Sequence, residues 1–185
     1  MNQVKQERLQ SRLEPEIKEF RDSCLTLQLA TVDNSGQPNV SYAPFVLLED
    51  GYYVLISQIA KHARNLLENP RVSLMMIEDE KTAKVLYARK RLTFEADVEK
   101  VERESAAWLL AIDGLTHRFG EIVEGLSGLE DFVLFRLKPT HGLFVKGFGK
   151  AFQVSGDDLI DFVHLTEGHR RIKDGSEIQE PSEKL

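Results

Sequence analysis

Five histidines are the residues of this 185-residue chain best suited to bind a metal or to move a proton: His62, His117, His141, His164 and His169. No two of them have a compact metal-ligand spacing such as His-x-x-x-His, so the sequence gives little support to a dedicated zinc site. His169 differs from the others because it follows Gly168 in a predicted loop and directly precedes Arg170 and Arg171. A loop histidine beside arginines is usually just solvated, but a neutral imidazole flanked by guanidinium groups also suits a haem iron and its propionates.

A second group with chemical potential is a run of four cations inside a chain whose formal net charge is −6. It comprises Lys84, Arg89, Lys90 and Arg91. Such charges often keep a solvated edge strand from pairing with other chains. Arginine forks also bind carboxylate or phosphate groups in a bidentate manner, so a local anion site is the alternative.

The composition argues against several classes of protein. An acidic net charge is not typical of nucleic-acid-binding domains, which are basic. No apolar run approaches the roughly 20 residues that span a bilayer, and the first residues lack the apolar core of a signal peptide. The single cysteine, Cys24, can form no internal disulfide, and we interpret it as a structural thiol. We therefore expect one cytoplasmic globular domain that binds neither nucleic acid nor membrane.

The elements that must position these residues are mostly strands. Short runs rich in aromatic and β-branched residues predict strands at 26–32, 39–48, 52–56, 72–77, 131–138 and 143–154, with one or two more within 84–101. Turns are expected at 33–36, 49–51 and 139–142. Gly147 and Gly149 lack the third glycine and the following helix of a dinucleotide motif, so they indicate a bulge or a close backbone approach. Many short strands and few long helices favour a mainly β, α+β fold built as an antiparallel barrel.

Helical periodicity predicts helices over residues 4–20, 103–119, 121–126 and 159–163. A further short basic helix is expected after Ser57, whose hydroxyl would cap it, and before Asn69-Pro70, which would end it. Its buried face would be formed by Ile59, Ala63, Leu66 and Leu67. A cationic helix start beside a sheet edge suits a phosphate or a carboxylate.

Two motifs in this central part resemble the split β-barrel of flavin-binding proteins related to pyridoxamine-phosphate oxidase. The first is Leu29-Ala30-Thr31 followed by Gly36-x-Pro38, and the second is Ser57…Lys61…Asn65-Leu66…Asn69-Pro70-x-Val72. The resemblance implies a split antiparallel β-barrel of the FMN-binding-protein type, with peripheral helices.

Longer segments resemble the bacterial haem-utilisation proteins of the HugZ/HutZ type, especially the HutZ-like branch. They are VKQERL (4–9), LEPEIKEF (13–20), PNVSYAPF (38–45), ARKRLTF (88–94), LFVKGFG (143–149) and GHR (168–170). The resemblance implies a homodimeric split barrel that binds haem as its substrate. It also implies degradation of the haem with oxygen and an electron donor, ascorbate or a reductase, to release iron.

Carried over residue by residue, the resemblance implies that His169 is the axial ligand of the haem iron, with Arg170 beside it. Asp131 would accept a hydrogen bond from the other ring nitrogen, across the contact with the neighbouring subunit. Such a carboxylate fixes the imidazole tautomer and makes it a stronger ligand. Thr26 matches a family position near that contact, and its hydroxyl would hold Asp131 in place.

Two further residues of the haem site follow from the same resemblance. Arg91 would pair with a propionate or with anions near the iron, and His62 would lie at the dimer interface. The expected organisation is a helical N-terminal segment (1–22), a split-barrel domain (23–164), a ligand-bearing C-terminal loop (165–173) and a polar, disordered tail (174–185).

Two alternative functions remain open at the level of sequence. An FMN-dependent oxidoreductase of the pyridoxamine-phosphate oxidase type would use the helix after Ser57 together with Arg89 and Arg91. A haem carrier without turnover would need the same ligand and pocket as a haem-degrading enzyme.

Overall fold

The structure is a computed structural model in which residues 3–155 are described, with side chains described from residue 10 onward. The helix expected at 159–163, the loop 165–173 and the tail 174–185 lie outside the described residues. So do His164, His169 and Arg170.

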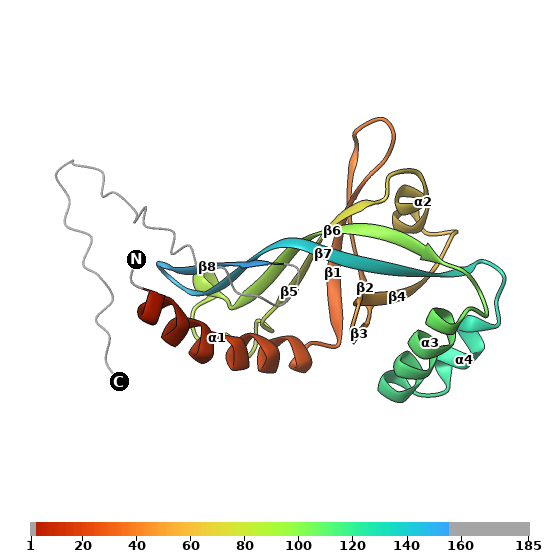
Figure 1. Cartoon of the computed structure of the whole chain (residues 1–185). Coiled ribbons are helices and arrows are strands. Elements are labelled where there is room, and N and C mark those ends of the chain that lie inside the picture. The colour runs from red at the N-terminus through yellow and green to blue at the C-terminus, as the bar shows by residue number, and fades with distance from the viewer. Residues whose placement is uncertain (1–2, 156–185) are drawn as a thin grey trace.

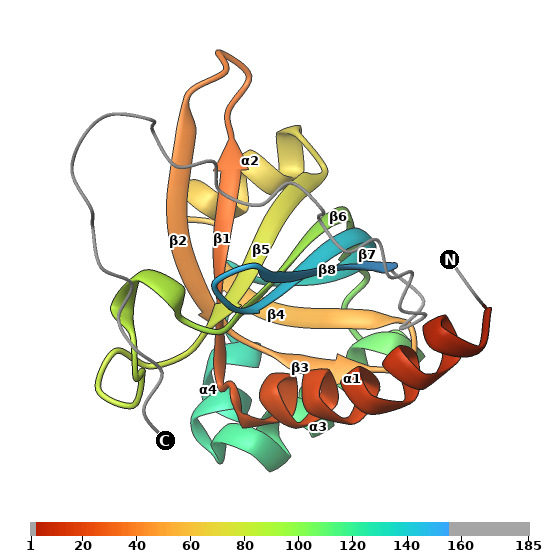
Figure 2. The same cartoon turned by 90° about the vertical axis from the view of Figure 1, so that its left-hand side faces the viewer.

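In the described part of the chain, eight strands form one antiparallel sheet, which confirms the mainly β prediction. They are β1 (Thr26–Val32), β2 (Pro38–Pro44), β3 (Val46–Leu48), β4 (Gly51–Ser57), β5 (Arg71–Ile77), β6 (Arg91–Val101), β7 (Phe132–Gly147) and β8 (Lys150–Ser155). Their order is β2-β1-β5-β6-β7-β4-β3, with β8 also paired to β7, and Figure 2 shows the successive strands fanned beside one another. The sheet is not closed, because β2 and β3, although consecutive in the chain, form its two ends.

The long strand β7 connects the two halves of the molecule (Figure 1). Its first part pairs with β4 and its second part with β8, while β6 runs along the opposite edge. The turn predicted at 139–142 is therefore wrong. A β-bulge occupies this region instead, where Glu95 pairs with His141 but Ala96 pairs with Pro139. Thr140, the extra residue, donates a side-chain hydrogen bond to the Glu95 carbonyl oxygen at 3.1 Å, which accommodates the bulge without ending the strand.

The chain turns later, between β7 and β8, where Gly147 has φ 156° and Gly149 has φ 64°. Glycine adopts such positive φ values without the steric cost that a Cβ would impose. The prediction of a single strand at 143–154 is therefore wrong, because the run is the end of β7 followed by β8. The bulge predicted at the glycine pair is present as a register shift between Val145 and Gly147, and the hairpin turn follows it.

Two other strand predictions need correction. The run 39–48 is two strands, β2 and β3, separated at Phe45, because β2 pairs with β1 and β3 pairs with β4. The strand expected from residue 84 begins only at Arg91, and a short 3₁₀ turn (Leu86–Ala88) precedes it. Arg89 donates from its Nε to the Glu78 carbonyl oxygen at 2.8 Å. This bond stabilises the segment before β6 as a loop rather than a strand.

Within residues 3–155, four helices lie around the sheet: α1 (Gln3–Ser23), α2 (Lys61–Glu68), α3 (Ala106–Phe119) and α4 (Ile122–Ser127). The buried residues Leu13, Ile17 and Phe20 attach α1 to the core, and the Phe20 ring lies 6.1 Å from that of Phe144 on β7. The α3–α4 pair occupies the other end of the molecule (Figure 1). There Trp108, on α3, packs in a second apolar cluster, as its helical stripe predicted.

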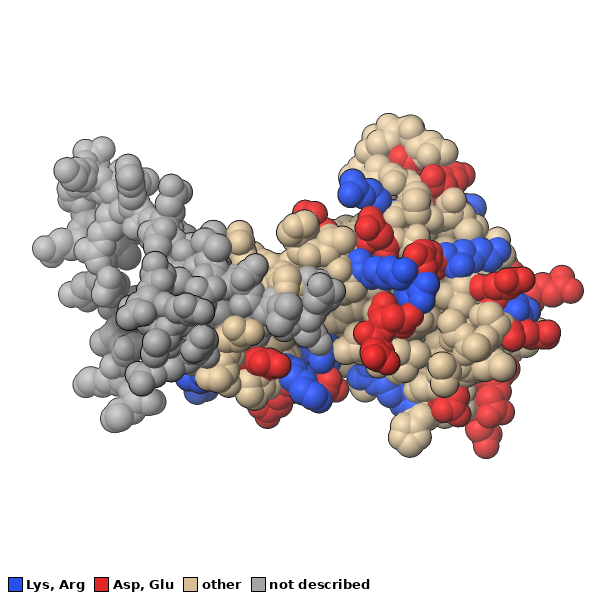
Figure 3. All heavy atoms as spheres, in the orientation of Figure 1, with Lys and Arg blue, Asp and Glu red and all other residues tan. Residues whose placement is uncertain are grey.

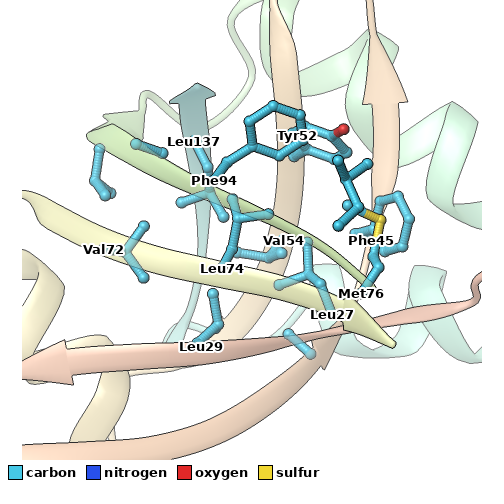
Figure 4. Close-up of a cluster of buried hydrophobic side chains, with 14 of the residues drawn as sticks. Leu27, Leu29, Phe45, Tyr52, Val54, Val72, Leu74, Met76, Phe94 and Leu137 are labelled. Carbon is cyan, nitrogen blue, oxygen red and sulfur yellow. The ribbon is translucent and has the colours of Figure 1, made fainter. Parts of the chain in front are cut away.

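The main core lies on the inner face of the sheet, where alternate residues of each strand are buried; on β1, for example, Leu27 and Leu29 are fully buried. Figure 4 shows its central side chains converging from several strands: Leu27, Leu29, Phe45, Tyr52, Val54, Val72, Leu74, Met76, Phe94 and Leu137. The alternation follows from strand geometry, because successive side chains of a strand point to opposite sides.

A Gly142→Ala variant is expected to lower the free energy of unfolding by about 1–3 kcal/mol, the usual cost of overpacking a core. A Cβ at this position would lie 2.5 Å from Cδ1 of Phe94 and 2.8 Å from the Thr93 carbonyl oxygen. Urea denaturation of the variant and the parent measures the effect. The matched control is Gly125→Ala in α4, where no atom lies within 4 Å of the new methyl group. Equal stability of the Gly142→Ala variant and the parent would contradict the packing described here.

Candidate functional site

The structure describes four of the residues that the sequence placed in a haem site. Thr26 is the first residue of β1, His62 lies on α2, Arg91 is the first residue of β6, and Asp131 directly precedes β7. Among residues 3–155, no group of three or more His, Cys, Asp or Glu side chains could hold a metal ion. The described residues also form no helix long and apolar enough to cross a membrane.

Arg91 lies on the outer face of the sheet, opposite Ile77 on β5 and Val145 on β7. Its guanidinium group is half-buried and forms no hydrogen bond or ion pair with the described part of the chain. The neighbouring cations differ. Arg89 binds the Glu78 carbonyl oxygen and Glu80, and Lys90 lies 3.4 Å from Glu16 of α1 and 5.8 Å from the centre of the Phe20 ring. Among the described residues, Arg91 is therefore the one of these three cations whose charged group has no partner and could bind an anion.

The charges on the face formed by β4, β6 and β7 are paired instead. Figure 3 shows basic and acidic side chains side by side there. Arg136 bridges Asp50 and Glu99, and Lys138 lies 2.6 Å from Glu99. The hydrogen bonds from Lys138 and Arg136 hold the pKa of Glu99 below its usual range. This face therefore offers no excess positive charge to an anionic ligand.

An open hollow of about 450 Å³ lies on the outer face near the bulge, between β5, β6, β7 and β8. Its lining includes Thr93, Glu95, His141, Leu143 and Gln153. Thr93 is two residues from Arg91 and points to the same side of β6, so the hollow and the free guanidinium group share one surface. The volume falls in the usual range of small-molecule sites.

Thr26 is exposed on the same outer face as Arg91. The register places Gln28 of β1 opposite Met75 of β5, and Met75 opposite Thr93 of β6. Thr26 and Arg91 each lie two residues before Gln28 and Thr93 on the same strands. They therefore lie on one row of the sheet, with β5 between them. Strands two places apart are separated by about 10 Å. The structure thus brings these two predicted site residues to one surface.

Asp131 lies elsewhere, at the end of β4, and Ser57 fixes it there. The Ser57 hydroxyl donates to Oδ2 of Asp131 at 2.5 Å, and the Gln58 backbone N–H donates to the Asp131 carbonyl oxygen at 2.7 Å. The interpretation of Ser57 as a helix cap is wrong, because α2 begins at Lys61 and its N-cap, Ala60, makes no side-chain cap bond. The sequence pattern gave no indication of the contact between Ser57 and Asp131, which depends on the pairing of β4 with β7.

Arg91 and Asp131 are not brought together within one chain. Arg91 pairs with Val145, which is about 14 residues beyond Asp131 along β7, or roughly 45 Å at the usual rise of a strand. No hydrogen bond joins Thr26 to Asp131 within residues 3–155 either. One planar ligand can contact both ends of β7 only if they come from two copies of the chain.

Motif residues around α2 have structural partners. The buried amide of Asn65 donates to the Thr31 hydroxyl at 3.0 Å, which joins α2 to β1. Lys61 lies 3.4 Å from Asp33 in the β1–β2 turn, so the cation at the helix start already faces a carboxylate. Asp33 also accepts hydrogen bonds from Ser35 and from the Gln37 backbone, and these bonds lower its pKa to about 2.

The apolar face predicted for α2 is only partly correct. Ala63 and Leu66 are buried, whereas Ile59 is 75% exposed and Leu67 is 41% exposed. Ile59 precedes the helix instead of lying on it, and its backbone N–H donates to the Ser57 hydroxyl. These exposed apolar side chains remain available for contact with another molecule.

His62 is half-buried on α2, and burial lowers the pKa of its imidazole below the ordinary value of 6.5. The folded protein then binds fewer protons at this site than the unfolded chain does. The contribution of His62 to the free energy of unfolding is therefore lost as the pH falls from the pKa of the unfolded state toward the lower pKa of the folded state.

A His62→Gln variant is expected to show a smaller decrease in its urea midpoint than the parent between about pH 6.5 and pH 5, because it no longer carries this buried imidazole. The measurement is urea denaturation across that interval. The parent, measured across the same interval, provides the reference slope. An unchanged slope in the His62→Gln variant would contradict the assignment.

The chain is similar to known proteins over most of its length. A family model described as pyridoxamine 5′-phosphate oxidase matches residues 13–146. The sequence is 69% identical over 173 residues to heme oxygenase HutZ of Vibrio cholerae serotype O1, and the match covers 94% of this chain and 98% of that protein.

Two solved structures share the fold and a substantial part of the sequence. The crystal structure of HutZ from Vibrio cholerae, described as a heme storage protein, has a TM-score of 0.71 and 66% identity, covering 74% of this chain and 96% of that one. Campylobacter jejuni ChuZ has a TM-score of 0.80 and 31% identity, covering 89% of this chain and 68% of that one.

Proposed function

Since the chain belongs to the pyridoxamine 5′-phosphate oxidase family, in its HutZ-like haem-utilisation branch, we propose that it is a haem oxygenase-like enzyme. It binds haem and, with oxygen and an electron donor, opens the porphyrin and releases iron. The likeness to heme oxygenase HutZ over nearly the whole chain carries this proposal. The guanidinium group of Arg91 has no partner in the described part of the chain and lies beside an open hollow, which supports the proposal because haem presents carboxylates that such a group binds.

His169 is the axial ligand in this proposal, with Arg170 beside it, and Asp131 accepts a hydrogen bond from its second ring nitrogen. The bound haem supplies the iron that activates oxygen. The residues of the chain orient the imidazole and hold the propionates. Asp131 fits its role because its Oδ1 oxygen has no hydrogen-bond donor among residues 3–155, whereas Oδ2 is occupied by Ser57.

The site requires a second copy of the chain. Asp131 and Arg91 lie at opposite ends of β7, too far apart for one porphyrin, so a single haem would take them from different subunits of a homodimer. Thr26 and His62 would lie near that contact. The outer sheet face carries exposed apolar side chains that suit such an interface: Val32, Val40 and Tyr42 are 37%, 76% and 65% exposed.

The electron donor in this proposal is ascorbate or a reductase, and the compartment is the cytoplasm. A storage protein is the second candidate, because the HutZ crystal structure is described in those terms. It would use the same ligand and the same pocket. An FMN-dependent oxidase is less well supported, since Lys61, the cation at the start of α2, is already paired with Asp33.

The decisive experiment adds haem to the purified protein and follows its Soret absorbance after ascorbate is supplied in air. A haem oxygenase loses the Soret band and releases iron to a chelator, and the product is an opened tetrapyrrole. Stable absorbance under these conditions, and also with a reductase as donor, would favour storage. Yellow protein that releases fluorescent FMN on denaturation would favour the oxidase.

A further inference from the structure

We propose that Ser57 is a positioning residue, which holds the carboxylate of Asp131 in one orientation so that its second oxygen faces the axial imidazole. This inference rests on the proposed function, in which Asp131 receives a hydrogen bond from that imidazole. Ser57 itself would touch neither haem nor iron. Its effect would pass through Asp131 alone.

The hydrogen bonds of Ser57 indicate which atom receives its hydroxyl proton. The backbone N–H of Ile59 donates to the Ser57 Oγ at 3.1 Å, so that oxygen already serves as an acceptor. A hydroxyl has one proton to donate, and an ionised carboxylate can only accept. The contact between Ser57 Oγ and Asp131 Oδ2 is therefore a hydrogen bond donated by the serine.

Backbone pairing holds the two residues at this separation. Ser57, the last residue of β4, is in register with Phe132, the first residue of β7. The Gln58 N–H extends the pairing by one step, because it donates to the Asp131 carbonyl oxygen at 2.7 Å. Both main chains are thus fixed on either side of the side-chain bond, and the Asp131 side chain keeps its rotamer through Ser57.

The two carboxylate oxygens of Asp131 differ in their hydrogen bonds. Oδ2 is occupied by Ser57, whereas Oδ1 has no hydrogen-bond donor within the described part of the chain. A carboxylate that orients a metal-bound histidine is usually hydrogen-bonded in turn, and such outer partners tune the ligand strength of the imidazole. Loss of the Ser57 hydroxyl would let the Asp131 carboxylate rotate about its χ angles, so the hydrogen bond to the imidazole would weaken in part of the population.

The test is resonance Raman spectroscopy of the full-length protein loaded with ferrous haem, read at the iron–imidazole stretching band. Asp131→Asn should shift the band to lower frequency, because an amide is a weaker acceptor than a carboxylate. Ser57→Ala should broaden the band and move it part of the way in the same direction. Ser57→Thr, which keeps a hydroxyl, should restore the parent band. The rate of haem loss with ascorbate should fall about tenfold in Ser57→Ala, the usual scale for an outer-shell partner.

Ser127→Ala is the matched control, since it removes an exposed serine hydroxyl that bonds only to the Glu124 carbonyl oxygen. An unshifted band in Ser57→Ala beside a shifted band in Asp131→Asn would overturn the role of Ser57 and leave the proposed function intact. Equal shifts in Ser57→Ala and Ser57→Thr would also overturn it, because they would indicate altered packing rather than a lost hydroxyl. An unshifted band in Asp131→Asn would overturn the Asp131 assignment and this inference together.

Discussion

A His169→Ala variant is expected to lose at least about 100-fold in haem affinity, since even outer-shell partners of a metal ligand typically contribute 10–100-fold. The physical reason is that the imidazole is the one proposed bond between protein and iron. Arg91 would still attract a propionate, but an exposed ion pair alone contributes little binding energy. Titration of haem into the variant, followed at the Soret band, measures the loss.

His117→Ala serves as the control for removing a histidine. His117 is exposed in the last turn of α3, at the opposite end of the molecule from α1 (Figure 1). The His117→Ala variant should therefore bind haem like the parent. Parent-like affinity and an unchanged Soret band in His169→Ala would contradict the ligand assignment. The imidazoles to examine next would then be His62 and His141, because His141 lines the hollow on the outer sheet face.

Local signals in the sequence predicted much of the fold. The strands β1 and β5 were predicted from short runs rich in aromatic and β-branched residues, and the first turn was predicted because Asp33 is suited to bond its own neighbouring backbone. The stripe containing Trp108 and Leu115 predicted the buried face of α3. These features depend on residues close together in the chain, which is why a single sequence reveals them.

Features that depend on distant pairing were missed. Pro139 and Gly142 are typical turn residues, yet β6 pairs with β7 on both sides of them and keeps the strand continuous through a bulge. Ser57 has the composition of a helix cap, but its hydroxyl is taken by Asp131, which is distant in sequence. In both cases a tertiary contact overrode a local preference, and the local preference was the only signal available.

The candidate site was also predicted only in part from local features of the sequence. Arginine chemistry alone singled out the cationic run, but only the structure separates Arg91, which is free among the described residues, from Arg89 and Lys90, which are paired. The roles of Asp131 and Thr26 came from the family resemblance and stay predictions. Neither residue has a composition or spacing that marks it as part of a ligand site.

The proposed hydrogen bond between His169 of one chain and Asp131 of the other leads to the prediction that most directly tests a shared site. In a two-fold symmetric dimer, each haem would take His169 from one chain and Asp131 from the other. A heterodimer of His169→Ala and Asp131→Asn chains then has both lesions in one site and none in the other. It should therefore recover about half of the parent's rate of haem loss per dimer, although each homodimeric variant is nearly inactive.

Co-expression of the two variants with different affinity tags, and purification through both tags, would isolate this heterodimer. A heterodimer of the parent with the His169→Ala chain controls for the tags and should have the same half activity. If His169 and Asp131 instead act within one chain, every site of the mixed dimer lacks one of them and no activity returns. Because the proposal takes the hydrogen bond of Asp131 from the imidazole of the other subunit, recovery by the mixed dimer is the outcome that it predicts.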